Sequence, residues 1–198
     1  MIAIIDYNTG NLRSVENALS RIGARYCVTS DPEVVLKADR VLLPGVGEAS
    51  NAMKNLKNTG IDVIIPTLKV PVLGICIGMQ LMCRHCEEGN VDTMGIFDTE
   101  VRRIRPDKEK GIKVPHMGWN TVESLKTRLF DGIKEKEWFY FVHSYAPETC
   151  RETIAETDYG VIFSGALANG NFFGTQFHPE KSGFAGEQLL KNFIKIQI

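Results

Sequence analysis

The 198-residue sequence lacks any apolar run that approaches the ~20 residues of a membrane-spanning helix. It also lacks an excess of one charge, because 23 Lys and Arg against 24 Asp and Glu give a formal net charge of −1. Near-neutrality indicates no general affinity for nucleic acids or acidic membrane surfaces. The first residues, MIAIIDYN, are typical of a first strand rather than of a signal peptide. We therefore expect a cytoplasmic protein without nucleic-acid or membrane partners.

The cysteines lack the pattern of a disulfide framework. They are odd in number and irregular in spacing: Cys27, Cys76, Cys83, Cys86 and Cys150. Cys83 and Cys86 form a C-x-x-C pair, but no second pair completes a zinc site. We interpret them as half-buried thiols late in a helix, and we expect neither a metal nor an organic cofactor.

Strands and helices alternate through the first half of the chain. Short apolar strands are predicted at 2–6, 26–29, 39–43 and 72–75. Helices are predicted at about 11–22, from 32 onward, at 48–58, at 61–68 and at 79–86. This alternation predicts an α/β fold with a doubly wound, mostly parallel sheet and helices on both of its faces.

After Gly95 the pattern changes to short strands separated by turns. These strands are predicted at 97–104, 113–115, 137–144, 152–156 and 161–167. A last strand at 171–177 and a closing helix at 186–196 follow. The second half therefore adds a smaller antiparallel section. Because no linker interrupts the sequence, we expect a single domain over residues 1–198.

One stretch combines a strand, a sharp turn and a helix, with a cysteine at the bend. Gly74 and Gly78 stand two residues before and after Cys76, which is the spacing of a nucleophile elbow with Cys in the usual place of Ser. The helix N-terminus there favours a thiolate, and the N–H of Ile77 could stabilise an oxyanion. A small structural cysteine is the alternative. The catalytic interpretation needs a base elsewhere in the chain.

The best candidate for that base is His178, at the end of the last predicted strand. Pro179 keeps its predecessor extended, so that residues 178 and 180 can project to the same side. Glu180 could then fix the His178 tautomer that takes a proton from Cys76. The other histidines lack a nearby carboxylate or point away from the elbow: His85, His116 and His143. We predict a Cys76–His178–Glu180 triad that transfers an acyl group through a thioester.

The motifs around this predicted triad resemble those of class I, triad-type glutamine amidotransferases. GICIGMQ surrounds the cysteine and QFHPEKSG contains the histidine and the carboxylate. Within that family the chain is similar to the glutaminase subunits of imidazole glycerol phosphate synthases, which act in histidine biosynthesis. The motifs typical of that branch are DYNTGNLRSV, LPGVGEA and PHMGWN. The resemblance runs nearly from end to end.

The resemblance implies glutamine as the substrate. Cys76 would attack the side-chain amide, His178 would protonate the departing ammonia and then activate water, and Glu180 would orient His178. The oxyanion would lie between the N–H of Ile77 and an N–H of the loop at residues 45–47. This loop would reorient when the partner binds its own substrate. The residues implied in binding glutamine or the oxyanion are Val46, Gly47, Ile77, Gln80, His143, Ser144 and Tyr145.

The resemblance also implies a second polypeptide. The predicted elements leave no residues for a synthase, so the ammonia would pass to a separate cyclase subunit with a (β/α)₈ barrel fold, in a heterodimer. The residues implied at that interface are Asn11, Trp119, Tyr140 and Lys181. Three alternatives stay open: the glutaminase of another synthase, such as one for pyridoxal phosphate, a stand-alone cysteine hydrolase of γ-glutamyl compounds, or a non-catalytic thiol sensor.

Overall fold

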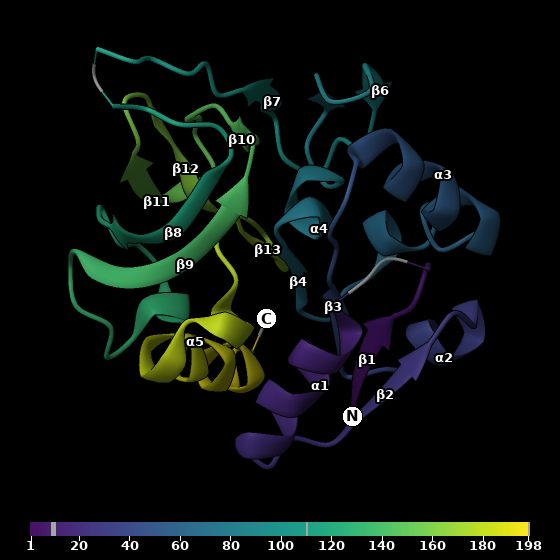
Figure 1. The fold of residues 1–198 in the computed structure, drawn as a ribbon. Coiled ribbons are helices and arrows are strands. Elements are labelled where there is room, and N and C mark those ends of the chain that lie inside the picture. The colour runs from purple at the N-terminus through teal and green to yellow at the C-terminus, as the bar shows by residue number, and fades with distance from the viewer. Residues whose placement is uncertain (9–10, 110, 198) are drawn as a thin grey trace.

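A seven-stranded sheet crosses the molecule in the computed structural model, which describes residues 1–8, 11–109 and 111–197 (Figure 1). Its strands, in spatial order, are β11 (Thr153–Asp158), β12 (Ile162–Asn169), β13 (Phe172–Thr175), β4 (Val72–Ile75), β3 (Arg40–Leu43), β1 (Ile2–Ile5) and β2 (Tyr26–Thr29). The strands from β13 to β2 run parallel, whereas β11 and β12 are antiparallel. The predicted mostly parallel sheet is confirmed.

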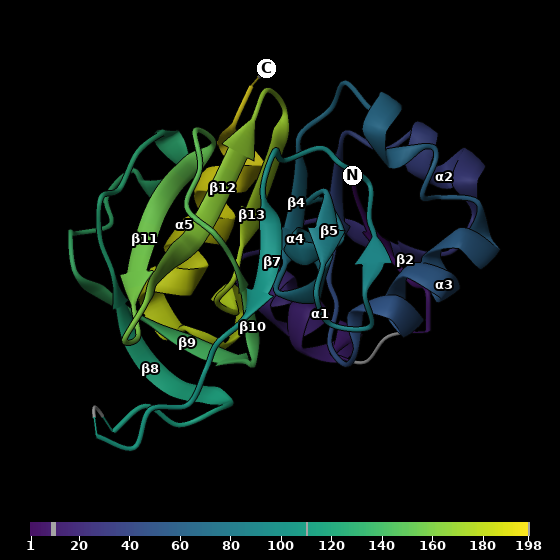
Figure 2. The same cartoon turned by 90° about the horizontal axis from the view of Figure 1, so that it is seen from above.

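Helices cover both faces of this sheet. Its main helices are α1 (Leu12–Arg21), α2 (Pro32–Leu36), α3 (Ala49–Thr59) and α5 (Gly183–Lys195). The chain moves outward from β1 to β2 and then back to β3 and β4, so right-handed crossovers place α1 opposite α2 and α3. Figures 1 and 2 show α5 on the same side as α1, and Arg21 Nε donates to Glu187 Oε1 between them at 2.7 Å.

Two smaller sheets accompany the main one. The first has the order β10 (Tyr145–Pro147), β7 (Glu100–Arg103), β5 (His85–Cys86) and β6 (Val91–Asp92). Its outer pairs are antiparallel, but β5 and β7 run parallel, so this sheet is mixed. The other pairs β8 (His116–Val122) with β9 (Glu137–His143) in antiparallel register. Short 3₁₀ turns complete the chain: η1 (Ile65–Thr67), η2 (Arg128–Phe130) and η3 (Pro179–Lys181). In the described parts of the chain, no helix has the length and apolar character that a membrane crossing requires.

The helix predicted at 79–86 is wrong. The helix α4 (Ile77–Gln80) has a single turn, and residues 85 and 86 form β5. The carbonyls of Leu81, Met82 and Cys83 accept hydrogen bonds from the backbone N–H groups of residues 94–97. Those carbonyls are therefore unavailable for helical hydrogen bonds. Cys83 and Cys86 are therefore not helical. They are also fully buried rather than half-buried, because neither is accessible to solvent.

Two further elements differ from the prediction, and a proline lies in each. The segment predicted as a helix at 61–68 is only the turn η1, where Pro66 has no N–H to donate. The strand predicted at 113–115 begins only after Pro115, as β8. The other predicted strands and helices are present with small shifts in their bounds.

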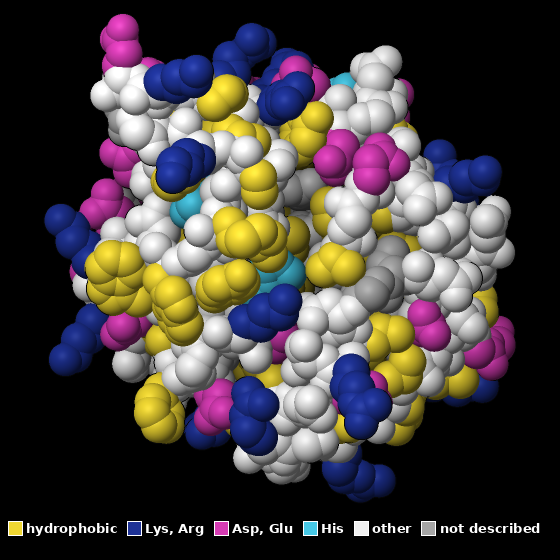
Figure 3. All heavy atoms as spheres, viewed as in Figure 1, with side chains coloured by type: hydrophobic (Ala, Val, Ile, Leu, Met, Phe, Trp, Pro, Cys, Tyr) yellow, Lys and Arg dark blue, Asp and Glu magenta, His cyan; other side chains and the backbone are white. Residues whose placement is uncertain are grey.

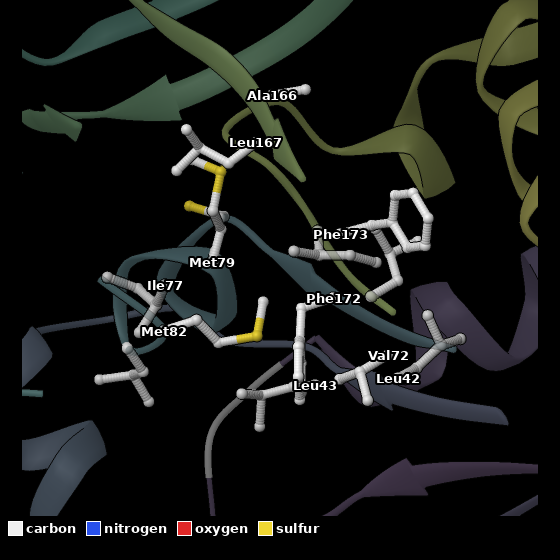
Figure 4. Close-up of a cluster of buried hydrophobic side chains, with 14 of the residues drawn as sticks. Leu42, Leu43, Val72, Ile77, Met79, Met82, Ala166, Leu167, Phe172 and Phe173 are labelled. Atoms are coloured by element: carbon white, nitrogen blue, oxygen red, sulfur yellow. The ribbon is translucent and has the colours of Figure 1, made fainter. Parts of the chain in front are cut away.

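The core packs directly against the segment that follows β4. Figure 4 shows side chains from several strands gathered around the turn after this strand: Leu42, Leu43, Val72, Leu167, Phe172 and Phe173. Met79 and Met82 reach into the same cluster. A Cβ on Gly174 would lie 2.4 Å from Met79 Cγ, so the glycine lets α4 pack closely on β13. This packing fixes the position of the bend between β4 and α4.

Candidate active site

Cys76 occupies the bend between β4 and α4. Its φ of 54° and ψ of −109° lie in a region that non-glycine residues rarely adopt. The backbone N–H of Cys76 donates to the carbonyl of Thr175 at 2.7 Å, which ties the bend to β13. Strained backbone of this kind concentrates at functional sites. The predicted elbow is thus present as a local structure.

The two flanking glycines are required by close packing. A Cβ on Gly78 would lie 1.7 Å from the carbonyl oxygen of Leu43, at the end of β3. A Cβ on Gly74 would lie 2.5 Å from Met82 Cε and 2.7 Å from the backbone of Gly78. Any larger residue at either position would displace the bend, which accounts for the spacing of the motif.

His178 and Glu180 meet next to this bend, because β13 pairs with β4. Nδ1 of His178 lies 2.8 Å from Oε1 of Glu180, and both side chains are fully buried. His178 is extended, with φ −98° and ψ 94°. The next residues, however, form the turn η3 rather than a continued strand. The turn therefore brings the carboxylate back to the imidazole, not the strand alternation that the sequence suggested.

The environment of His178 favours its protonated form. Burial lowers the pKa of the imidazole, but the nearby sulfur of Cys76 and the contact with the Glu180 carboxylate outweigh it and raise the pKa to about 10. Nδ1 faces the carboxylate of Glu180. Nε2 is buried and has no hydrogen-bond partner among the described residues. Nε2 is therefore the atom that can exchange a proton with Cys76 or a bound molecule.

Asn11, which the resemblance implies at a partner interface, also contacts the candidate triad. Its Nδ2 donates to Glu180 Oε1 at 2.5 Å, on the same oxygen that faces His178. Glu180 Oε2 is buried and has no hydrogen-bond partner among the described residues. Two contacts on one oxygen hold the carboxylate in a single orientation. The contact spans 169 positions along the chain, so no local pattern could have indicated it.

A cleft of about 250 Å³ lies beside Cys76. All the residues expected to bind glutamine or the oxyanion line it: Val46, Gly47, Ile77, Gln80, His143, Ser144 and Tyr145. The lining comes from the loop after β3, from the bend after β4 with α4, and from the segment that joins β9 to β10. Parts of the chain far apart in sequence therefore meet at the carboxyl ends of β3 and β4. In open α/β sheets, ligands bind at these ends of the strands.

Glu88 also lines the cleft, and no motif of the sequence indicated it. Its Oε2 accepts a hydrogen bond from the N–H of Ala49, in the first turn of α3, at 3.0 Å. Burial raises the pKa of this carboxyl group above its usual value. The prediction of a helix through residue 86 concealed the position of Glu88, because the side chain reaches the cleft only through the turn after β5.

His143 is held by a second histidine. Its Nδ1 lies 2.8 Å from the carbonyl of Tyr145 and its Nε2 lies 2.9 Å from Nδ1 of His116. Because a carbonyl only accepts, Nδ1 of His143 carries the hydrogen. Burial lowers the pKa of His116 to about 4 and that of His143 to about 3. Both rings are therefore neutral near pH 7, and His143 is a fixed wall of the cleft.

Three of the residues expected at an interface lie together next to His178. The rings of Trp119 and Tyr140 meet edge to face, with centroids 6.1 Å apart. Nζ of Lys181 lies 5.9 Å from the centroid of the Tyr140 ring. The backbone N–H of His178 donates to the carbonyl of Tyr140 at 2.9 Å. This group therefore adjoins the candidate triad.

Cys83 and Cys86 do not line the cleft. Burial raises the pKa of Cys83 well above its usual value and that of Cys86 to about 12. Protonated, buried thiols are poor nucleophiles and poor metal ligands. Within residues 1–8, 11–109 and 111–197, no group of three or more His, Cys, Asp and Glu side chains is arranged to hold a metal ion.

Known proteins resemble this chain over almost its whole length. Residues 3–196 match the family described as Glutamine amidotransferase class-I. Two relatives are named "Imidazole glycerol phosphate synthase subunit HisH". The protein from Bacteroides fragilis is 57% identical and that from Escherichia coli 46% identical, each over 98% of this chain and 99% of the relative.

Two solved structures share the fold at low sequence identity. One, described as a glutamine amidotransferase, has a TM-score of 0.72 at 17% identity, over 98% of each chain. Another, described as PurLQS from Thermotoga maritima, has a TM-score of 0.70 at 16% identity, over 98% of this chain and 97% of that one. Taken with the sequence matches, this chain belongs to the class I glutamine amidotransferase family, in the branch of the HisH subunits of imidazole glycerol phosphate synthase.

Proposed function

We propose that this chain hydrolyses glutamine and delivers the ammonia to the cyclase subunit of an imidazole glycerol phosphate synthase, in histidine biosynthesis. One observation carries the proposal. Cys76, with its strained backbone, faces a cleft and lies beside a buried pair in which Nδ1 of His178 is 2.8 Å from Oε1 of Glu180. The names of relatives that are 44–57% identical over nearly the full length support the same activity.

In the first half of the reaction, the Cys76 thiolate attacks the side-chain amide carbon of glutamine. A carbon–sulfur bond forms, and the amide oxygen becomes an oxyanion near the N–H of Ile77 and an N–H of the 45–47 loop. When the carbon–nitrogen bond breaks, Nε2 of His178 gives its proton to the leaving nitrogen. Ammonia departs and a γ-glutamyl thioester remains on the sulfur.

In the second half, water hydrolyses this thioester. Nε2 of His178 takes a proton from the water, and the resulting hydroxide attacks the thioester carbon. The carbon–sulfur bond then breaks, so that glutamate leaves and Cys76 returns to its starting form. Nδ1 of His178 keeps its hydrogen throughout and donates it to Glu180, which leaves Nε2 as the atom that exchanges protons. The net reaction converts glutamine and water into glutamate and ammonia.

Gln80 and Glu88 have the chemistry to hold the substrate. The two hydrogens of Gln80 Nε2 go to the carbonyl of Tyr145 and to Oε1 of Gln176, each at 3.0 Å. Oε1 of Gln80 is buried and has no hydrogen-bond partner in the described structure. We assign it to an N–H of glutamine. The carboxylate of Glu88 complements the positive α-ammonium group.

The loop at residues 45–47 has one fixed end and one free end. A Cβ on Gly45 would lie 2.5 Å from the hydroxyl of Tyr7 and 2.9 Å from the N–H nitrogen of Gly78. Gly47 has a φ of 102°, and a Cβ there would contact nothing within 4 Å. The peptide before Gly47 therefore has room to rotate. We assign to it the loop N–H of the oxyanion site, turned toward the cleft when the partner is loaded.

The chemistry of ammonia and one exposed surface support the proposed partner. Ammonia free in water is mostly protonated and no longer a nucleophile, so it must pass directly to the acceptor. Large exposed apolar side chains lie on one face of β8 and β9 and on the adjoining start of α5: Met117, Trp119, Trp138 and Phe184. Figure 3 shows hydrophobic side chains gathered over this region. Such patches are typical of protein–protein contacts.

We name this patch the β8–α5 face and assign it to the cyclase subunit, with its (β/α)₈ barrel fold, in a heterodimer. Tyr140 and Lys181 adjoin it, beside the candidate triad. The Lys181 ammonium group is suited to an acidic partner residue at the entrance for ammonia.

The deciding experiment measures glutamate release from glutamine by the purified chain, alone and with the cyclase subunit and its nucleotide ligand. We expect almost no glutamate release by the chain alone and a large rise with the loaded partner. Cys76→Ala should abolish that rise. Full activity without the partner would instead support a stand-alone hydrolase of γ-glutamyl compounds. Absence of glutamate in both conditions would refute the proposed function.

A further inference from the structure

The side chain of Gln176 contacts the sulfur of Cys76. Gln176 lies between β13 and His178 and is fully buried. Its Nε2 lies 3.6 Å from Cys76 Sγ, and its Oε1 accepts a hydrogen bond from Gln80 Nε2 at 3.0 Å. Because the oxygen is occupied by a donor, the –NH₂ group is the one that faces the sulfur. The contact therefore places an N–H donor on Sγ.

The orientation of Gln80 is fixed by a backbone carbonyl. Its Nε2 donates to the oxygen of Tyr145, which only accepts, so the amide of Gln80 cannot turn over without loss of that bond. The same Nε2 donates to Gln176. The Tyr145 oxygen thus determines the direction of both side-chain amides up to the sulfur of Cys76.

His143 holds the Tyr145 carbonyl from the other side, and His116 in turn holds His143. Asn120 Nδ2 lies 3.4 Å from Nε2 of His116, Nδ1 of His116 lies 2.9 Å from Nε2 of His143, and Nδ1 of His143 donates to the Tyr145 oxygen. The rings of Tyr159 and Phe141 stack on His116. The carbonyl therefore receives donors from two directions and has little freedom to move.

We propose that Gln176 stabilises the thiolate of Cys76, and that Gln80 and the carbonyl of Tyr145 are positioning groups that aim its N–H at the sulfur. The proposal rests on the assignment of Cys76 as the nucleophile. An N–H donor favours the charged form of its acceptor. The opposing contact is the carbonyl of Val142, 3.9 Å from Sγ, which can accept only from the thiol. Gln176 offsets that contact.

The need for a side-chain donor follows from the shortness of α4. This helix has only four residues, Ile77–Gln80, so its aligned peptide dipoles sum to less than those of a full helix. The charged group nearest to Cys76 is His178 at the start of η3, which Glu180 holds from its other side. The carboxyl group of Glu88 and the neutral His143 line the same cleft. Gln176 adds a neutral donor that keeps its hydrogen at every pH at which the protein is folded.

The test follows the alkylation of Cys76 by iodoacetamide against pH, with mass spectrometry of the Cys76 peptide. Gln176→Met removes the donor at similar length. We expect the half-maximal pH of alkylation to rise by about one unit, the effect of one hydrogen bond to a charged group. Gln188→Met makes the same change on α5, outside the cleft, and should leave the profile unchanged. Equal profiles in Gln176→Met and the wild type would overturn the proposal.

A second measurement follows Gln176 in the wild-type chain, with Cys76→Ala as its control. In the wild-type chain, the ¹⁵N and ¹H shifts of the Gln176 side-chain amide should follow the same pH midpoint as alkylation, and Cys76→Ala should abolish that transition. If the Gln176 amide shifts showed the same pH dependence in the wild type and in Cys76→Ala, the proposed contact would be refuted. These readings need no turnover, so they separate this proposal from the glutaminase assignment, which glutamate release by the wild type tests.

Discussion

At the scale of single residues, Glu88 offers a direct test of how the cleft binds its substrate. Glu88 uses Oε2 for the N–H of Ala49, and its carboxylate is the acidic group on the cleft wall near Gln80. Glu88→Gln keeps an oxygen for Ala49 but removes the charge. We expect KM for glutamine to rise about tenfold or more with a smaller change in kcat, because a charge-assisted hydrogen bond is lost.

Steady-state kinetics with the loaded partner measures this effect. Glu87→Gln is the matched control, since Glu87 accepts from the N–H of Arg103 and does not line the cleft. An unchanged KM in Glu88→Gln would remove Glu88 from the substrate site.

The buried histidine pair makes stability depend on pH. The unfolded chain binds a proton at each histidine below about pH 6.5, whereas folded His116 stays neutral down to about pH 4. The unfolded state thus holds more protons in this window, so the free energy of unfolding falls as the pH drops from 6.5 toward 4. We expect urea unfolding of His116→Phe to show a shallower fall than the wild type.

The control for this titration is Tyr159→Phe, which keeps the ring stacked on His116 and removes only a hydroxyl. Its pH dependence should match that of the wild type. Equal slopes for His116→Phe and the wild type would mean that the ring already takes up its proton in the folded state.

Whether the sequence alone predicts a contact of the site depends on how far apart the two residues lie along the chain. Cys76, with its flanking glycines, and the His178–Glu180 pair belong to short motifs, so the sequence alone indicated them. The contacts of Asn11 with Glu180 and of Gln176 with Cys76 span 169 and 100 positions. Side-chain partners so far apart follow only from the three-dimensional arrangement of the strands.

At the scale of elements, regular strands and helices were predictable and the segment after the elbow was not. Residues 79–86 contain good helix formers, but backbone groups from residues 93–97 occupy the carbonyls that a helix would use. Local propensity is a weak prior against such tertiary pairing. The same pairing places Glu88 beside the cleft, so the wrong helix and the missed site residue have one cause.

We expect the 45–47 loop to couple glutaminase activity to the binding of the loaded partner. Proline fixes φ near −65°, far from the φ of 102° at Gly47. In Gly47→Pro, we expect the partner-stimulated glutaminase rate to fall at least about tenfold, since a lost oxyanion donor costs more than this. Glutamate release with and without the nucleotide ligand measures the stimulation.

Gly170→Pro provides the comparison, because Gly170 also has a positive φ of 58° and open space around it, in the turn between β12 and β13. It should keep the stimulation wherever thermal unfolding shows a folded protein. Full stimulation in Gly47→Pro would exclude a rotating peptide in this loop.

At the scale of the whole molecule, the order of strands explains why the cleft and the β8–α5 face adjoin. β4 and β13 are neighbours in the parallel sheet, so the loops at their carboxyl ends carry Cys76 and His178 side by side. The β8–β9 pair reaches this edge because the carbonyl of Tyr140 accepts from the N–H of His178. Its inner face, with Phe139 and Phe141, is buried. Strand alternation therefore turns its outer face toward solvent, next to the candidate triad.

A partner that covers this outer face would bury Phe184, whose side chain is 93% exposed at the start of α5. In Phe184→Ser, we expect about tenfold weaker binding of the cyclase subunit by calorimetric titration, as for a truncated aromatic contact at an interface. Thermal unfolding should stay the same, because the ring makes few contacts within the chain. Val63→Ser is the control, since Val63 is 69% exposed but lies between α3 and η1. Equal loss in both variants, or none in Phe184→Ser, would place the partner on another face.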